Sequence, residues 1–330
     1  MKKLSLLLFM LTICLVVTIP AYAKRLKGCD YVYYKSPCWM PDSKHILYIK
    51  SVSHHKYRYG WLAAVSKSGD LWVGSDTYIC KMNIETRKEE VIKKYFSKVD
   101  RIKSKYEYFV EENGKAKSFP YEMEFHKIDC SRDGKWICFN SGTLHLLSAD
   151  GKTLKKLLVN SRSPKFSPDG KRILYQIYRR IVIPENPIQS RVQKISDLRL
   201  IDIDGTNDHL LVENAGHGIW HPGGEKIGFY IENTDGFFRT INVDGTDKKA
   251  VFETNCYPSD WAPSGKYINF LSTFLDMEGK RAKTEFKDVP TYGRFSSDGT
   301  KMVGGNLDIS FSKVGDEKET VLLKNYSKEY

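Results

Sequence analysis

A ten-residue pattern recurs six times along this 330-residue chain and constrains its fold more than any other feature. In most copies an aromatic residue is followed by Ser, Pro or Asp, then Gly, then a charged residue and an apolar stretch. The copies read WMPDSKHILY, CSRDGKWICF, FSPDGKRILY, WHPGGEKIGF, WAPSGKYINF and FSSDGTKMVG, and they start at Trp39, Cys130, Phe166, Trp220, Trp261 and Phe295. Such self-similarity is the signature of a repeat architecture.

Each copy predicts a β-hairpin. The Pro-Asp-Gly segment is turn chemistry, because Pro presets φ and Gly accepts a positive φ. The residue seven positions after the start is apolar in all six copies, and the one two positions later is aromatic in five. A step of two residues keeps both columns on one face of a strand.

A second hairpin follows the first in several units. Leu198–Glu213 and Phe238–Glu253 match at an offset of 40 residues, Leu144–Asn160 is a third copy, and Ile79–Lys94 and Leu307–Lys324 are looser ones. Four-stranded units that repeat at about 40 residues indicate propeller blades. We therefore predict an all-β, six-bladed β-propeller of four-stranded antiparallel blades.

Seven blades are the alternative, because 91 residues separate Ser43 from Gly134. Part of this interval is expected to form a separate hairpin that turns at Glu112-Asn113-Gly114, since Asn-Gly favours tight turns.

These hairpins resemble the repeat of TolB-like β-propellers, whose consensus is an aromatic residue followed by Ser-Pro-Asp-Gly-Lys and an Ile/aromatic strand. Residues 166–175 match it almost letter for letter, and the resemblance covers roughly residues 36–324. It concerns the propeller alone, since the α/β domain that precedes the propeller in TolB has no counterpart before Trp39. The resemblance implies a fold and no particular activity, because such blades serve docking proteins, sugar lyases and peptidase accessory domains.

The first 23 residues have the features of a signal peptide. Lys2-Lys3 precedes the apolar run Leu6–Ile19, and Ala21-Tyr22-Ala23 offers small residues for cleavage. Residues 24–330 are then expected to form one propeller domain in the periplasm or outside the cell. No later apolar stretch has the roughly 20 residues that a membrane span needs.

The net charge of +12 falls to +10 when the two lysines of the signal leave, and the basic residues are spread along the chain. A basic surface favours anionic partners. Nucleic acid is excluded as a partner, because export is expected and no recognition motif is present.

Six cysteines follow the cleavage site, and an even number in an exported chain permits disulfides. Cys130 and Cys138 flank one hairpin turn, and Cys29 and Cys38 lie nine residues apart, so these are the candidate pairs. No C-x-x-C motif exists, which argues against a zinc ribbon or a redox site.

The starts of the innermost strands are the candidate ligand site, because they converge on the channel of a propeller. Three residues before the aromatic position stand Lys127, Ser163, His217 and Tyr292, with Ser259 beside the equivalent Pro258. Extra segments at 50–77 and 176–196 open on the same face and are expected to roof the channel; they carry Arg58, Tyr59, Trp61, Arg179 and Arg180. Basic groups pair with carboxylates or sulfates, and aromatic faces offer apolar area to a sugar ring or a peptide side chain.

Two functions are compatible with these features. The first is a non-catalytic propeller of the cell envelope that binds a protein or an anionic glycan. The alternative is a lyase or hydrolase that acts on an acidic polysaccharide at the channel mouth. The sequence has no paired-carboxylate, multi-histidine or G-x-S-x-G signature, so no catalytic residue, metal or cofactor is predicted.

Overall fold

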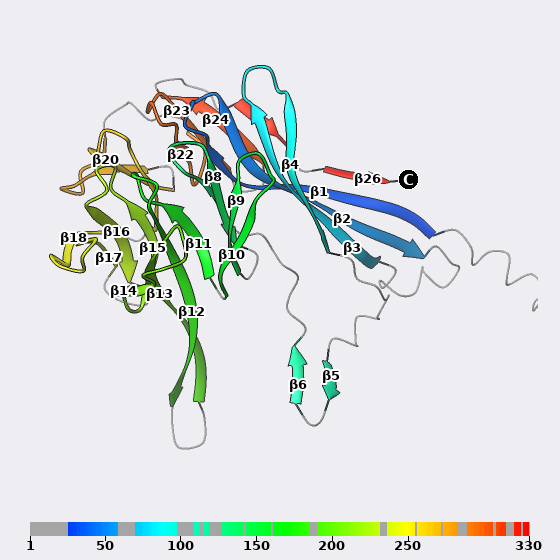
Figure 1. The fold of residues 1–330 in the computed structure, drawn as a ribbon, viewed down its shortest axis with the longest axis horizontal. Coiled ribbons are helices and arrows are strands. Elements are labelled where there is room, and N and C mark those ends of the chain that lie inside the picture. The colour runs from blue at the N-terminus through cyan, green and yellow to red at the C-terminus, as the bar shows by residue number, and fades with distance from the viewer. Residues whose placement is uncertain are drawn as a thin grey trace, which may run out of the picture.

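The computed structural model describes residues 26–58, 70–97, 109–112, 115–118, 127–140, 143–159, 161–184, 190–231, 236–254, 256–271, 273–282, 289–305, 308–314, 320–324 and 326–329. All regular elements within these ranges are β-strands (Figure 1). The predicted signal peptide, residues 1–23, lies outside them. Across the described ranges no helix has the length and apolar character needed to cross a membrane.

Six sheets follow one another along the chain as blades. Blade 1 contains β1 (Leu26–Trp39), β2 (His45–Arg58), β3 (Asp70–Asn83) and β4 (Glu89–Ser97), and β26 (Tyr326–Glu329) pairs with β1. Blade 2 contains β7 (Ile128–Cys130), β8 (Trp136–Asn140), β9 (Thr143–Ser148) and β10 (Leu154–Val159). Blade 3 contains β11 (Ser161–Phe166), β12 (Arg172–Pro184), β13 (Ser190–Asp202) and β14 (His209–Val212).

The remaining blades repeat this order. Blade 4 contains β15 (Ala215–Trp220), β16 (Lys226–Ile231), β17 (Phe237–Asn242) and β18 (Lys249–Glu253). Blade 5 contains β19 (Pro258–Trp261), β20 (Tyr267–Phe270) and β21 (Thr273–Asp276), followed by a bridge between Leu275 and Arg281. Blade 6 contains β22 (Arg294–Phe295), β23 (Lys301–Gly304), β24 (Ile309–Lys313) and β25 (Thr320–Leu323).

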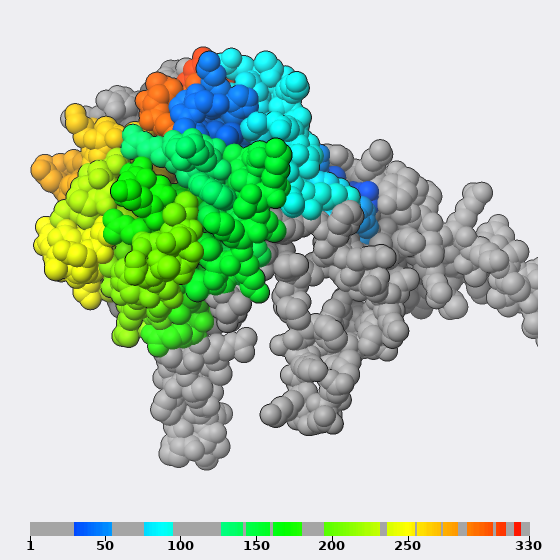
Figure 2. Space-filling view, in the orientation of Figure 1, coloured from blue at the N-terminus to red at the C-terminus, as the bar shows by residue number. Residues whose placement is uncertain are grey.

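The first strands of the blades form a closed ring. β1, β7, β11, β15, β19 and β22 contact one another in chain order, and β22 contacts β1. Figure 2 shows the result from outside, with the first blade in blue beside the last in orange. The protein is a six-bladed β-propeller.

The alternative of seven blades is wrong. The interval between Ser43 and Gly134 holds the long strands of blade 1 and a separate hairpin made of β5 (Phe109–Glu112) and β6 (Lys115–Ser118). Glu112 pairs with Lys115, as expected for the hairpin predicted here.

The repeated turn has a common hydrogen-bond pattern, seen clearly in blade 3. Ser167 Oγ donates to Asp169 Oδ1 at 2.5 Å and accepts from the Arg172 N–H at 2.9 Å. Gly170 has a φ of 70°, which glycine adopts without steric strain. Blades 2 and 6 repeat these bonds from Ser131 and Ser296. The turn motif thus fixes the start of each second strand.

The apolar columns of the repeat form the cores between blades. In blade 3, Ile173 is fully buried and Tyr175 is 1% exposed. One core cluster joins Leu174 and Leu198 of blade 3 to Trp220 and Phe229 of blade 4. Burial of these side chains between neighbouring sheets holds the ring together.

The described parts of the two expected insertions are extensions of paired strands. β12 and β13 stay in register out to Pro184 and Ser190, and β2 and β3 pair out to Tyr57 and Asp70. Figure 1 shows both extensions projecting beyond the blades. Each pair of strands forms an antiparallel two-stranded ribbon. This arrangement gives no support to the expectation that the two segments roof the channel.

Candidate ligand-binding mouth of the channel

Four innermost-strand starts share an unusual backbone. The registers of β1, β11 and β15 shift at Ser36, Ser163 and His217, which marks a β-bulge in each strand. Tyr292 lies just before β22, and β19 has its own register shift between Pro258 and Asp260. Ser36, Ser163, His217 and Tyr292, at equivalent repeat positions, have φ values of 53°, 48°, 55° and 56°. Non-glycine residues avoid this left-handed region, and such strain is concentrated at functional sites. The bulges therefore mark the channel mouth as a candidate site.

A second ring of residues lies one position before the aromatic column. It consists of Cys38, Asp129, Lys165, Ile219, Asp260 and Arg294. Four of the six are charged. This column is also present in the sequence repeat, whereas the predicted strand-start residues come from the column two residues earlier and from Ser259.

Two of these charged side chains cross the channel. Arg294, on β22, pairs with the carboxylate of Asp129 on β7, and its Nη1 donates to the Ile128 carbonyl at 3.1 Å. Lys165 Nζ, on β11, donates to the Ser259 carbonyl at 3.0 Å. Each bridge passes one intervening blade, because β1 lies between β22 and β7 and β15 lies between β11 and β19.

The two acids of this ring are also engaged with backbone. Asp129 Oδ2 accepts the Phe166 N–H at 2.8 Å, and Asp260 Oδ2 accepts the Phe295 N–H at 2.9 Å. Each acid therefore ties its own blade to the next one. Because these carboxylate oxygens already accept backbone hydrogen bonds, Asp129 and Asp260 are poorly placed to act as acid or base catalysts.

Aromatic rings lie around the strand starts. The His217 imidazole stacks on the Tyr257 ring with centroids 3.9 Å apart and planes 9° apart. Tyr230 meets Tyr257 edge-on at 5.0 Å. Tyr257 is 43% exposed and Tyr292 is 44% exposed. We call Lys127, Lys165, His217, Tyr257, Ser259 and Tyr292 together the channel mouth.

The mouth carries a surplus of positive charge. Desolvation, followed by the charges of Lys165 and Lys127, lowers the pKa of His217 to about 4. Desolvation and the charge of Arg294 lower the pKa of Lys165 to about 8, and the same two causes lower the pKa of Lys127. Lys127 and His217 still contact solvent. Side chains that are crowded by protein yet open to water are typical of a solvated channel.

The sequence candidates divide into three groups: residues at the strand starts, residues outside the described set, and Arg179, which has a partner within its own blade. Lys127, Ser163, His217, Ser259 and Tyr292 lie at the innermost strand starts. The side chains of Arg58 and Arg180, at the strand extensions, and residues Tyr59 and Trp61 lie outside what the structure describes.

Arg179 has a different partner from the one expected. Its Nη2 donates to Asp197 Oδ1 at 2.9 Å and its Nε also donates to that carboxylate. Asp197 is 3% exposed and accepts the Asn214 N–H at 3.0 Å as well. Because this bidentate pair fastens β12 to β13, Arg179 is committed within blade 3.

The described cysteines are free thiols. Cys130 pairs with Ile137 and Cys138 pairs with Asp129, so the two cysteine side chains lie on opposite faces of their hairpin. The candidate disulfide between them is not formed in this structure, where both thiols are free. Cys38 is buried and free, and the side chain of Cys29 lies outside the described set. Burial raises the pKa of the Cys38 thiol to about 12, which makes it a poor nucleophile.

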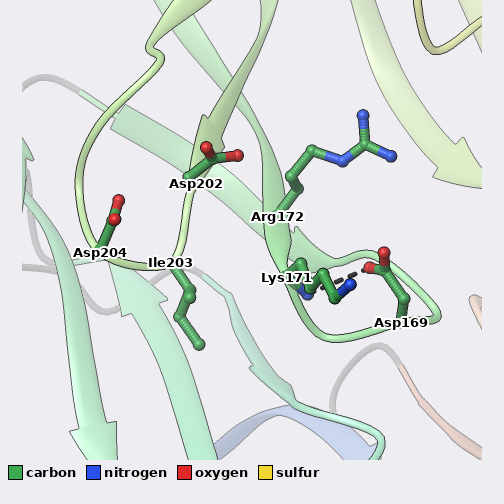
Figure 3. A pocket seen from close by; sticks show the side chains of 6 residues that line it. All are labelled: Asp169, Lys171, Arg172, Asp202, Ile203 and Asp204. Carbon is green, nitrogen blue, oxygen red and sulfur yellow. Dashed lines mark hydrogen bonds between the residues drawn. The ribbon is translucent and has the colours of Figure 1, made fainter.

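A pocket lies on the opposite face, beside the turns of blade 3 (Figure 3). It is lined by Asp169, Lys171, Arg172, Asp202, Ile203 and Asp204. Asp169 and Asp204 accept backbone N–H groups within their own turns at 3.0 and 2.8 Å. Asp202 accepts from the Asn207 amide at 2.6 Å. Turn chemistry thus accounts for these carboxylates. No cluster of metal-binding side chains occurs within the described ranges.

Comparison with known proteins supports the fold and leaves the function open. The chain matches no protein-family description, and no curated protein matches it by sequence. A gluconolactonase from Xanthomonas campestris superposes with a TM-score of 0.51 at 9% identity, covering 88% of this chain and 86% of that one.

Two further solved propellers match more weakly. An acylaminoacyl peptidase from Pyrococcus horikoshii has a TM-score of 0.47 at 15% identity, covering 89% of this chain and 46% of that one. An oligogalacturonate lyase from Vibrio parahaemolyticus has a TM-score of 0.43 at 12% identity, covering 89% and 90%. At such identities the likeness concerns the fold alone.

Proposed function

We propose that the protein is a non-catalytic binding propeller of the TolB-like kind, exported to the periplasm or beyond, that binds an anionic glycan at its channel mouth. The observation that carries the proposal is the surplus of positive charge there. Lys127 has no ion-pair partner among the described residues, and the acids that act on Lys165, namely Asp129 and Asp260, are bonded to backbone. A ligand carboxylate would supply the missing negative charge.

The aromatic side chains favour a glycan over a small inorganic anion. Tyr257 and Tyr292 are half-exposed at the starts of their strands, and Tyr257 stacks on His217. An amphipathic ring of this kind can cover the apolar face of a sugar while its hydroxyl stays wet. An acidic peptide shares the charge but needs no flat platform.

The geometry favours binding over hydrolysis. Glycoside hydrolysis uses two carboxyl groups placed on either side of the scissile bond. Here Asp129 and Asp260 accept hydrogen bonds from the N–H groups of Phe166 and Phe295, and Asp129 also pairs with Arg294. Both carboxyl groups are therefore engaged in the fold, which favours binding over hydrolysis.

One observation keeps an acidic-sugar lyase as the second candidate. The pKa of Lys165, lowered to about 8, gives this side chain a neutral amine fraction at mildly basic pH, as a general base requires. If the wild-type protein formed an unsaturated uronate from an acidic sugar and Lys165→Met did not, the function would be catalysis and not binding.

The test compares one ligand with and without its charges. We expect trigalacturonate to bind to the mature protein in calorimetry, and its methyl ester to bind at least about tenfold more weakly, which corresponds to about 1.4 kcal/mol. Lys127→Gln should weaken binding of the acid by a similar factor and leave binding of the ester unchanged.

Lys266→Gln is the matched control, because Lys266 is exposed in the turn of blade 5, at the other end of β19 from the mouth. Equal affinity for the acid and the ester, or equal loss in both variants, would contradict the proposal. Binding of polyglutamate with no binding of trigalacturonate would redirect it to an acidic protein partner.

A further inference from the structure

Ser259 has a hydroxyl with unused hydrogen-bonding capacity. Its Oγ is buried and has no hydrogen-bond partner in the structure, and its carbonyl accepts from Lys165 Nζ at 3.0 Å. Buried hydroxyls are nearly always hydrogen-bonded, and each exception needs an explanation. Here the unpartnered hydroxyl belongs to the same residue whose carbonyl anchors the Lys165 ammonium.

His217 lies beside the same groups. Tyr257, which stacks on His217, is two residues before Ser259 in the chain. The charged side chains that act on the imidazole are Lys165, from β11, and Lys127, just before β7. No carboxylate of the described residues offsets these charges at the imidazole, because Asp260 of β19 and Asp129 of β7 act on Lys165 instead. His217 is therefore a neutral ring held among positive charges.

The backbone adds an independent observation. His217 keeps a φ of 55° at a bulge in β15, between Gly216 and Gly218. Glycine would adopt this conformation more easily, and glycines stand on both sides. A side chain retained at a strained position points to a role for that side chain.

We propose that a carboxylate of the bound ligand is held between the Lys165 ammonium, the Ser259 hydroxyl and the His217 imidazole, and that His217 takes up a proton when the carboxylate binds. This inference rests on the proposed function and specifies the group that the mouth recognises. The ammonium and the hydroxyl each donate one hydrogen bond to the carboxylate. The imidazole then becomes a third, charged donor, because the arriving anion offsets the repulsion from the two lysines.

Proton uptake makes the affinity depend on pH in a defined direction. The free protein holds the pKa of His217 at about 4, against an ordinary value of 6.5. If the bound carboxylate restores the ordinary pKa, binding should be about 25-fold tighter near pH 5 than near pH 7.5. Affinity rises as pH falls through the bound-state pKa, and the rise stops near the free-state pKa.

The experiment measures the affinity for trigalacturonate at these two pH values by calorimetry at constant ionic strength. NMR titration of the His217 ring, with and without the ligand, reports its pKa directly in the unaltered protein. We expect the bound-state pKa to be higher by two units or thereabouts. His217→Asn should flatten the pH dependence while binding near pH 7.5 persists, and Ser259→Ala should weaken binding about fivefold or more.

His209→Asn is the control, because His209 is exposed at the start of β14, away from the innermost strands. Equal affinity at both pH values with an unshifted His217 titration would overturn the inference and leave the proposed function standing. Absence of binding at both pH values would overturn both.

Discussion

Arg294 illustrates how one side chain can connect blades that are not neighbours. It reaches from β22 past β1 to Asp129 on β7, and its own carbonyl accepts the Trp39 indole N–H at 2.9 Å. Burial lowers the pKa of Arg294, but the charges of Asp129, Cys38 and Asp260, together with the hydrogen bond to Asp129, outweigh burial and raise that pKa. Arg294 thus stays charged inside the ring, and its contacts connect blades 6, 1 and 2.

Loss of Arg294 should therefore destabilise the propeller strongly. Removing one partner of a buried pair leaves the other uncompensated, so we expect Arg294→Met to lower the free energy of unfolding by about 3 kcal/mol. Urea denaturation measures this. Asp129→Asn in the same background should recover part of the loss, because it removes the stranded charge.

Arg132→Met serves as the reference substitution. Arg132 is exposed in the turn of blade 2, where changes stay within about 0.5 kcal/mol. If Arg294→Met destabilises the protein no more than Arg132→Met does, the cross-channel pair has no structural role.

The residues of the mouth were only partly predictable from sequence. Repeat alignment identified Lys127, His217 and Tyr292 as strand starts, because position in a repeat converts directly into position around a ring. It gave no sign that Arg179 would pair with Asp197, since that contact depends on the register of β12 and β13. The left-handed residues were also missed, because Ser and Tyr are not enriched at positive φ and the enrichment of His is too weak to predict one position.

At the scale of elements, the turn motif is the most reliable part of the sequence. Its signals are local: Ser caps the turn, Asp accepts the next N–H, and Gly supplies the positive φ. Strand length was less predictable. Residues 50–77 and 176–196 exceed the repeat and are predicted to be insertions, whereas their described parts continue the strand pairing of their blades.

The turn account predicts a specific cost for Gly170→Ala. Gly170 has a φ of 70°, and an added Cβ would meet nothing within 4 Å, so backbone strain alone should destabilise the protein, by about 1 kcal/mol. The midpoint of thermal unfolding should fall accordingly.

Gly223→Ala in the turn of blade 4 is the matched control. Its Cβ would meet only the side chain of Glu225, which is exposed and flexible, and its φ is not positive. Equal destabilisation by the two substitutions would contradict the account, because the positive φ of Gly170 would then add no cost of its own.

At the scale of the whole molecule, contacts between blades 6 and 1 close the ring. Asp298 N donates to Ser43 Oγ at 3.2 Å, and Lys301 Nζ donates to the Ser43 carbonyl at 3.0 Å. Val303 and Ile309 of blade 6 share a core cluster with Trp39 and Tyr48 of blade 1. The one turn that lacks glycine thus has Ser43 at the closure, where its hydroxyl accepts a hydrogen bond from the last blade.

The channel mouth forms only when the ring of blades is closed. Lys127, Lys165 and His217 come from three different blades and become neighbours because the innermost strands converge. Sequence can assign each to a strand start, but their mutual electrostatic effects require the closed molecule. This convergence is the basis of the proposed function.

The most direct test of that function is the position of bound trigalacturonate in a crystal structure of the complex near pH 5. We predict a ligand carboxylate within hydrogen-bonding distance of Lys165 Nζ and Ser259 Oγ, with a sugar ring against Tyr257 or Tyr292. A ligand seated instead in the pocket beside Arg172 and Asp202 on the opposite face would contradict the assignment of the channel mouth as the binding site.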